Sequence, residues 1–305
     1  MPAYTHPADP VPTTRLAVER GASLTELMVS LLIFLVFGGA MVRVTMQHQQ
    51  ILETQEEVVA TQQDARGSLL IMSRALHAAG CGVPARLSDD GATGQNVAVL
   101  TATAATVSFR GCFTDPPVRA TVDAAATLNA VPSALVLTVK TVGPDAEFAV
   151  GNTVYLSSAT RWADGTVTAF AAGDPALLTA NFTVANVLPT TFAAGSRVCR
   201  EEIMTFSLAD DPDRLLPQLQ QTLAIPPATG AALQVAPNIT TLALTYWNST
   251  GTLLTAFPLS LADRRSIHGV AVDLGLEAQT HYAGTNEKLT VQQSTAIQPR
   301  NLFVN

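Results

Sequence analysis

The chain has 305 residues and a formal net charge of −7, with hydrophobic residues at 48% and charged residues at 13%. An average soluble domain carries about 25% charged residues, so this composition excludes a disordered chain and predicts a folded protein with a weakly charged surface. Lys140 and Lys288 are the sole lysines, and the arginines are scattered along the chain. Because binding to a phosphate backbone requires a basic stripe, no nucleic acid partner is expected.

Residues 22–42 form an apolar run whose single charged residue is Glu26. A helix needs about 20 apolar residues to cross a bilayer, so the run predicts a transmembrane helix, preceded by a polar leader of residues 1–21. The alternative is a secretory signal peptide that is cleaved near residues 37–40. An acid within the apolar segment disfavours this alternative, because burying it in hydrocarbon costs free energy.

Residues 20–27, with the sequence Arg-Gly-Ala-Ser-Leu-Thr-Glu-Leu, resemble the processing site of type IV prepilins. The resemblance implies that a membrane prepilin peptidase cleaves after Gly21 and methylates the new amino group of Ala22. Glu26 is then the fifth residue of the mature chain, as in the family. One departure is that the family usually has Phe or Met at the position of Ala22.

A role for Glu26 also follows from the cost of charge in a membrane. The new amine of Ala22 and the carboxylate of Glu26 both lie at the membrane edge, and within one helix they approach each other imperfectly. A neighbouring subunit displaced along a filament brings its own amine beside Glu26, which replaces two desolvation penalties by one paired contact. Glu26 is therefore expected to set the axial register of assembly. The alternative is that its side chain reaches the membrane interface near the helix start, where the helix dipole favours an acid.

The helix is predicted to continue beyond the membrane, giving one helix over residues 22–80. No proline occurs between residues 46 and 79, and apolar residues recur at steps of three and four, at Ile51, Val58, Ala65, Leu69, Met72 and Leu76. From Ser23 to Ala79 the helix would be about 85 Å long. Its middle is polar all round, whereas residues 69–72 are apolar and predict burial under a globular domain. A Gly-rich exit and a proline at residues 80–84 predict its end.

Residues 81–305 are predicted to form an exported β-rich head, so the fold class is α+β with an antiparallel head. Apolar residues alternate with polar residues at 135–140, 241–246 and 270–276. Turns are expected at 115–117, Asp164–Gly165, 173–175 and 210–212. Residues 151–198 are interpreted as a compact β insertion that forms a separate small barrel, with strands near 153–156, 166–170 and 182–187.

This plan of leader, long helix and β head resembles the PilW-type minor pilins and the J-type pseudopilin of type II secretion. The similarity is specific near residues 20–36, and weaker support comes from residues 62–82 and 297–302. It implies a non-enzymatic minor pilin that primes or caps type IV pilus assembly.

The partners of such a subunit would be other pilin subunits, contacted through the N-terminal helix, the prepilin peptidase and the inner-membrane assembly platform. It would cross the inner membrane once with its head in the periplasm, and later lie at a pilus tip, a pseudopilus tip or the cell surface. The alternatives are a type II secretion pseudopilin and an adhesive binding module mounted on a membrane or filament.

Cysteine usage agrees with an exported head, because Cys81, Cys112 and Cys199 all follow the apolar run. Three cysteines allow one disulfide and three pairings. The pairing Cys81–Cys112 is favoured, since it would clamp the helix end to the first strands. Three free buried thiols are the alternative.

The sequence contains no motif for catalysis, cofactor binding or metal binding. The histidines lack ligand spacing, and the serine hydrolase, zinc protease, P-loop and paired Cys-x-x-Cys patterns are all absent. Asp210, Asp211 and Asp213 crowd one turn that could contact Ca²⁺, but the loop lacks the Gly and distal Glu of an EF-hand, so a solvated turn is favoured. No enzyme activity, cofactor or metal is expected, and an anchored hydrolase is the least favoured reading.

Overall fold

The structure is a computed structural model that describes residues 23–83, 98–114, 119–141, 148–158, 161–185, 187–211, 216–281 and 288–299. The predicted processing site, Gly21 and Ala22, lies outside the described residues. The chain divides into two compact units, Met1–Glu53 and Thr54–Asn305, which are treated separately below.

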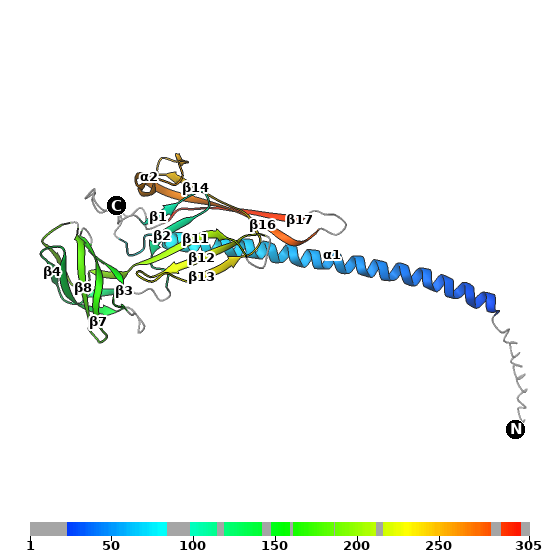
Figure 1. Cartoon of the computed structure of the whole chain (residues 1–305), viewed down its shortest axis with the longest axis horizontal. Coiled ribbons are helices and arrows are strands. Elements are labelled where there is room, and N and C mark those ends of the chain that lie inside the picture. The colour runs from blue at the N-terminus through cyan, green and yellow to red at the C-terminus, as the bar shows by residue number, and fades with distance from the viewer. Residues whose placement is uncertain are drawn as a thin grey trace, which may run out of the picture. The chain divides into compact units, whose positions relative to one another are not determined.

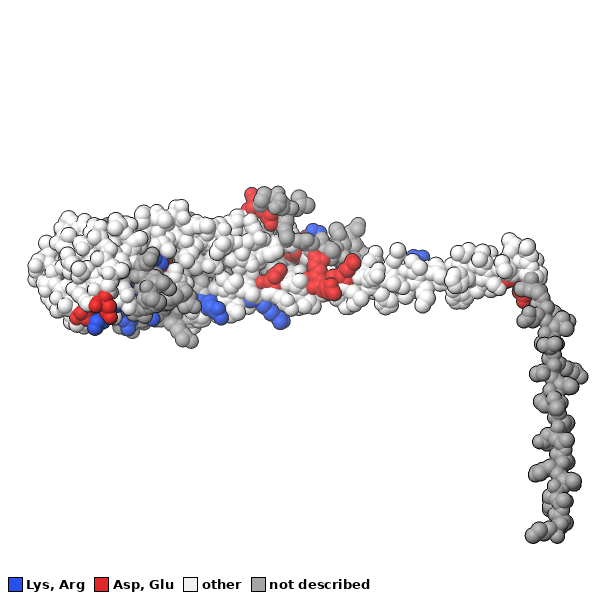
Figure 2. Space-filling model, turned by 90° about the horizontal axis from the view of Figure 1, so that it is seen from below, with Lys and Arg blue, Asp and Glu red and all other residues white. Residues whose placement is uncertain are grey.

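The long helix α1 runs from Leu24 to Ala78 without interruption, which confirms the predicted continuous helix. The carbonyl of Ser23 accepts hydrogen bonds from the N–H groups of Glu26 and Leu27, so the helix begins one residue after Ser23. Its most apolar 18-residue stretch has a mean hydropathy of 2.3 and is 0% buried, which makes α1 long and apolar enough to cross a bilayer. Figure 2 shows almost no charged side chains along this stretch of helix.

Within the second unit, the last turns of α1 bury one stripe of residues, namely Thr61, Ala65, Ser68, Leu69, Met72 and Leu76. Ala65, Leu69, Met72 and Leu76 confirm the later part of the predicted stripe, whereas Val58 is half-buried and Ile51 is 43% exposed. Leu70 and Ile71, which were expected to be buried with their neighbours, are instead 58% and 41% exposed. The reason is geometric, because consecutive residues of an α-helix point about 100° apart and a one-sided contact buries only every third or fourth residue.

Two antiparallel sheets share a hydrophobic core with this stripe of α1 (Figure 1). The five-stranded sheet has the order β1-β2-β11-β12-β13, with strands β1 Val99–Ala102, β2 Val107–Gly111, β11 Glu202–Ala209, β12 Gln218–Ala224 and β13 Ala232–Ala236. The four-stranded sheet has the order β15-β14-β16-β17, with strands β15 Leu253–Leu254, β14 Ile239–Asn248, β16 Ile267–His281 and β17 Lys288–Ile297. A short helix, α2 Leu261–Ser266, precedes β16 and is capped by Ser260. The predicted alternation in β14 and β16 is confirmed, since Leu242, Leu244, Tyr246 and the four apolar residues from Val270 to Leu276 are buried.

A closed barrel is inserted between β2 and β11, two strands that pair with each other in the five-stranded sheet. Its strand order is β10-β3-β5-β8-β7-β6, with strands β3 Arg119–Val122, β5 Ser133–Thr141, β6 Thr153–Ser157, β7 Trp162–Ala171, β8 Ala176–Ala185 and β10 Arg197–Arg200. A side ribbon pairs β4 Ala126–Leu128 with β9 Thr190–Phe192. The barrel has a hydrophobic core of its own. The region expected at 151–198 is therefore only the later part of the barrel. The barrel begins at β3, because β3 and β5 are two of its six strands.

One predicted turn is corrected. Asp164 and Gly165 lie inside β7, where the pairing register with β8 shifts between them, as in a β-bulge. A Cβ atom on Gly165 would lie 2.6 Å from the backbone oxygen of Asn181, so the glycine serves close strand approach rather than chain reversal. The expected turn at residues 173–175 does connect β7 to β8, and β8 begins at Ala176 instead of near Phe182.

Candidate functional site

The structure places Glu26 in the first turn of α1, as the third residue of the helix, with an exposed side chain. The unpaired backbone N–H groups at a helix start carry partial positive charge, which stabilises an acid at this position. Large apolar side chains then follow from Leu27 to Met46, and all of them are at least 49% exposed. The first unit therefore presents one carboxylate at the beginning of an uncovered apolar helix.

A second cluster contains all three cysteines. Cys81 follows the end of α1, Cys112 follows β2, and Cys199 lies in β10 of the barrel. The thiol of Cys112 donates to the carbonyl oxygen of Cys81 at 3.1 Å, and its sulfur lies beside the sulfur of Cys199 under Gly82. All three are free thiols in the structure, so the pairing Cys81–Cys112 stays a prediction. The sequence argument did not place Cys199 in the same cluster.

Gly82 passes over this thiol cluster with a positive φ of 72°. A Cβ atom at this position would lie 2.8 Å from the sulfur of Cys199 and 2.9 Å from the sulfur of Cys112. Only glycine combines this left-handed backbone with so close an approach. The backbone that leaves α1 therefore packs directly against the thiol groups of Cys112 and Cys199.

Glu202, the first residue of β11, fixes the chain next to Cys112. Its side chain is 1% exposed, and it accepts hydrogen bonds from the N–H groups of Phe113 and Thr114 at 2.6 and 2.8 Å and from the Thr114 hydroxyl at 2.6 Å. The guanidinium of Arg200 donates to the same carboxylate at 2.8 Å. A buried carboxylate is stable only when its oxygens are paired in this way.

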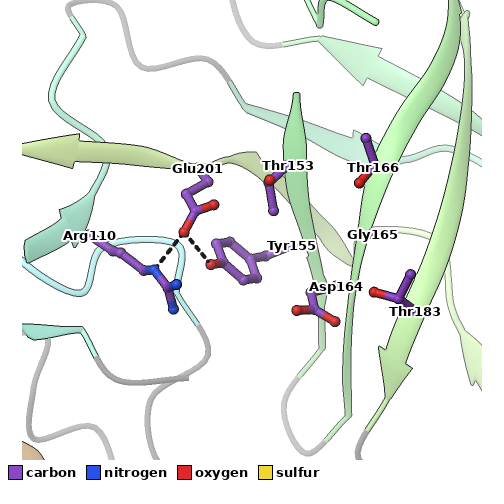
Figure 3. A pocket seen from close by; sticks show the side chains of 8 residues that line it. All are labelled: Arg110, Thr153, Tyr155, Asp164, Gly165, Thr166, Thr183 and Glu201. Carbon is purple, nitrogen blue, oxygen red and sulfur yellow. Dashed lines mark hydrogen bonds and ion pairs between the residues drawn. The ribbon is translucent and has the colours of Figure 1, made fainter. Parts of the chain in front are cut away.

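The neighbouring acid, Glu201, links the five-stranded sheet to the barrel. Its Oε1 atom lies 2.5 Å from Nε of Arg110, in β2, and accepts a hydrogen bond of 2.9 Å from the hydroxyl of Tyr155, in β6 (Figure 3). Burial raises the pKa of Tyr155 above its ordinary value, so the hydroxyl stays protonated and remains a donor. Glu201 and Glu202, which are adjacent where β10 passes into β11, thus face two different polar networks.

These networks meet on the outer face of the barrel. Strand register aligns Arg119, Cys199, Tyr155 and Asp164 in one row across β3, β10, β6 and β7. Paired residues on neighbouring antiparallel strands point to the same face of a sheet. The thiol cluster and the Glu201 network are therefore neighbours in a single junction where the barrel meets the sheet and the end of α1.

A polar pocket of about 190 Å³ opens beside this junction and is lined by Arg110, Thr153, Tyr155, Asp164, Gly165, Thr166, Thr183 and Glu201 (Figure 3). Its lining supplies acids, hydroxyls and one guanidinium, which suits hydrogen bonding to water or to a small polar group. No nucleophile paired with a histidine base lines it. In the parts of the chain that the structure describes, no three His, Cys, Asp or Glu side chains are placed to hold a metal ion.

Arg110, Tyr155, Glu201 and Glu202 belong to no motif that the sequence shows. One signal was available: the run Arg200-Glu201-Glu202 is unusual in a chain with only 13% charged residues, and it spans the junction of two strands. Charged residues in such a place must be paired when they are buried. Asp213, from the expected acidic turn, lies outside the described residues.

Comparison with protein-family models, with curated proteins and with solved structures gave no match for this chain. The function is therefore argued from the chain's own residues.

Proposed function

We propose that this protein is a minor pilin or pseudopilin, a non-enzymatic subunit that joins a helical filament of the type IV pilus class through its N-terminal helix. Cleavage after Gly21 would free the amine of Ala22, and α1 would then assemble with the helices of other subunits. The inner membrane would hold the chain before assembly, with the β-rich unit on the outer side.

The observation that carries the proposal is the lone acid at the start of an exposed apolar helix. Glu26 occupies the first turn of α1, and the apolar side chains that follow it are uncovered. Bilayer lipid or the apolar faces of neighbouring helices could cover these side chains. A carboxylate in such surroundings costs several kcal/mol unless a cation pairs with it. The freed amine of a neighbouring subunit supplies that cation, and each added subunit repeats the contact.

The second half of α1 supports the proposal from the other end. Four residues of its buried stripe, Ala65, Leu69, Met72 and Leu76, belong to the core that the two sheets share, so the helix is integral to the folded unit that follows. A cleavable tether would need no such continuity.

The direct test is Glu26→Ala in the full chain, expressed with the other filament components. We expect normal membrane insertion, because the apolar stretch is unchanged, and at least a tenfold loss from the sheared filament fraction, because the paired contact is gone. A tenfold loss corresponds to about 1.4 kcal/mol. Quantitative immunoblotting of membrane and filament fractions measures both.

Glu56→Ala is the matched control, since Glu56 is an exposed acid on the same helix outside the apolar stretch. It should enter filaments at the wild-type level. Equal incorporation of wild type and Glu26→Ala would contradict the pairing argument. Deleting the gene separates the remaining alternatives: loss of all filaments supports priming, whereas normal filaments with lost adhesion support a binding module, and lost protein secretion supports the pseudopilin.

A further inference from the structure

The three thiols form a cluster with one sulfur in the middle, and this arrangement has a chemical consequence. Sγ of Cys112 lies 3.1 Å from the carbonyl oxygen of Cys81, and a Cβ atom on Gly82 would lie within 2.9 Å of the sulfurs of both Cys112 and Cys199. Any disulfide that uses Cys112 therefore leaves the third thiol beside the sulfur that it could attack. Thiol–disulfide exchange requires that contact between a thiolate and a disulfide sulfur.

We propose that Cys112 is the shared sulfur of an exchangeable disulfide, which alternates between Cys81–Cys112 and Cys112–Cys199. The first form ties the end of α1 to the exit of β2. The second form ties the exit of β2 to β10 of the barrel. The exchange concerns the head alone and does not depend on whether α1 assembles into filaments.

The chemistry balances with a disulfide-bearing oxidant such as oxidised glutathione. The Cys81 thiolate attacks one sulfur of the oxidant, forms a mixed disulfide and releases one oxidant thiolate. Cys112 attacks Sγ of Cys81 as its proton passes to the departing oxidant sulfur, which forms Cys81–Cys112 and releases the second half of the oxidant as a thiol. The Cys199 thiolate then attacks Sγ of Cys112, which forms Cys112–Cys199 and returns Cys81 as a thiolate without further oxidation.

The surroundings of the cluster fit these roles. Cys81 is half-buried and reachable from solvent, whereas Cys199 is 4% exposed and is expected to react from within the cluster. The hydrogen bond from Cys112 is the main cause that lowers the pKa of Cys81 to about 6, helped by Arg119 and Arg197 and opposed by burial and Glu202. The hydrogen bond from Cys112 also lowers the pKa of Cys199. The same contacts and burial raise the pKa of Cys112, so Cys81 is the favoured first attacking thiolate while Cys112 is reduced.

The central sulfur is held in place by groups already described. Glu202 binds the N–H groups of the two residues after Cys112, and Gly82 leaves the space above the sulfurs free. The fold therefore holds the Cys112 sulfur between Cys81 and Cys199.

The experiment uses the reduced full-length protein in detergent, treated with oxidised glutathione and quenched with acid at increasing times. Proteolysis without reductant and mass spectrometry then identify the linked peptides. We expect Cys81–Cys112 and Cys112–Cys199 in the same sample, with Cys81–Cys199 at least tenfold rarer. A single stable pair whose third thiol never joins a disulfide would overturn the exchange, and so would equal amounts of all three pairs or no disulfide at all.

Variants sharpen the result. Cys199→Ala should trap Cys81–Cys112 alone, Cys81→Ala should trap Cys112–Cys199 alone, and Cys112→Ala should lose both, with folding checked by circular dichroism. If a variant fails to fold, the wild-type time course still tests the exchange.

Reduced wild type should also react with iodoacetamide at Cys81 with a midpoint near pH 6, because the thiolate is populated above that pKa. A midpoint at the ordinary value, near 9, would remove the thiolate from the mechanism.

Discussion

Glu202 is a residue whose contacts bring three parts of the head together. Its carboxylate accepts hydrogen bonds from Phe113 and Thr114, which follow β2, and from Arg200 at the end of β10. Glu202 itself is the first residue of β11. Because this group is almost fully buried, its oxygens cannot exchange these partners for water. Its removal leaves both backbone N–H groups and one guanidinium without their acceptor.

Glu202→Ala is therefore expected to lower the free energy of unfolding by about 3–5 kcal/mol, the usual cost of removing one member of a buried ion pair. Denaturant unfolding of the full chain in detergent measures the change. Trp162, in the barrel, and Trp247, in the four-stranded sheet, supply one fluorescence probe in each part. Glu56→Ala should change stability by less than about 0.5 kcal/mol, because Glu56 is exposed. A loss below about 1 kcal/mol for Glu202→Ala would show that the clamp is not needed.

Among single residues, the sequence predicts those that stand out in a local pattern, but not those whose role depends on contacts with distant parts of the chain. Glu26 stands out in sequence because it interrupts an apolar run. Glu201 and Glu202 do not stand out in the same way, since their partners are far away along the chain: Tyr155 precedes Glu201 by 46 positions and Thr114 precedes Glu202 by 88. Pairs so distant form only when strands from two parts of the chain are brought together.

Among the elements, α1 was the most predictable, because its signals are local. Periodic apolar residues, the absence of proline and a Gly-rich exit lie within a few turns of each other, and they predicted both ends to within two residues. The barrel was less predictable. Its later strands show local alternation, but the pairing of β3 with β5 and β10 closes it, and no local pattern reports that pairing. The Asp164–Gly165 pair misled for the same reason, since a bulge and a turn use the same residues.

The contact of α1 with the head gives a matched pair of variants. Met72 is 0% exposed within the shared core, whereas Leu70, two residues away, is 58% exposed. Met72→Ala should lower the free energy of unfolding by about 2–5 kcal/mol, because it removes buried contacts and leaves a cavity. Leu70→Ala should lower it by less than about 0.5 kcal/mol. Equal effects of the two substitutions in denaturant unfolding would contradict the burial of this face.

For the molecule as a whole, the two units differ in how their apolar side chains are shielded from water. The unit Thr54–Asn305 buries two hydrophobic cores within itself. The unit Met1–Glu53 contains the apolar part of α1, whose side chains are uncovered and need an external apolar environment. An exposed apolar surface of this size marks contact with a membrane or with other chains. The proposed assembly uses both in turn, first lipid and then neighbouring helices.

The central claim is that the leader is removed after Gly21 and that Glu26 remains near the new terminus. Mass spectrometry of the N-terminal peptide, from protein recovered from its native membrane, tests it most directly. We expect a peptide that begins with N-methylated Ala22 and retains Glu26. A peptide that begins at Met1, or one that begins beyond the apolar run and so lacks Glu26, would contradict it.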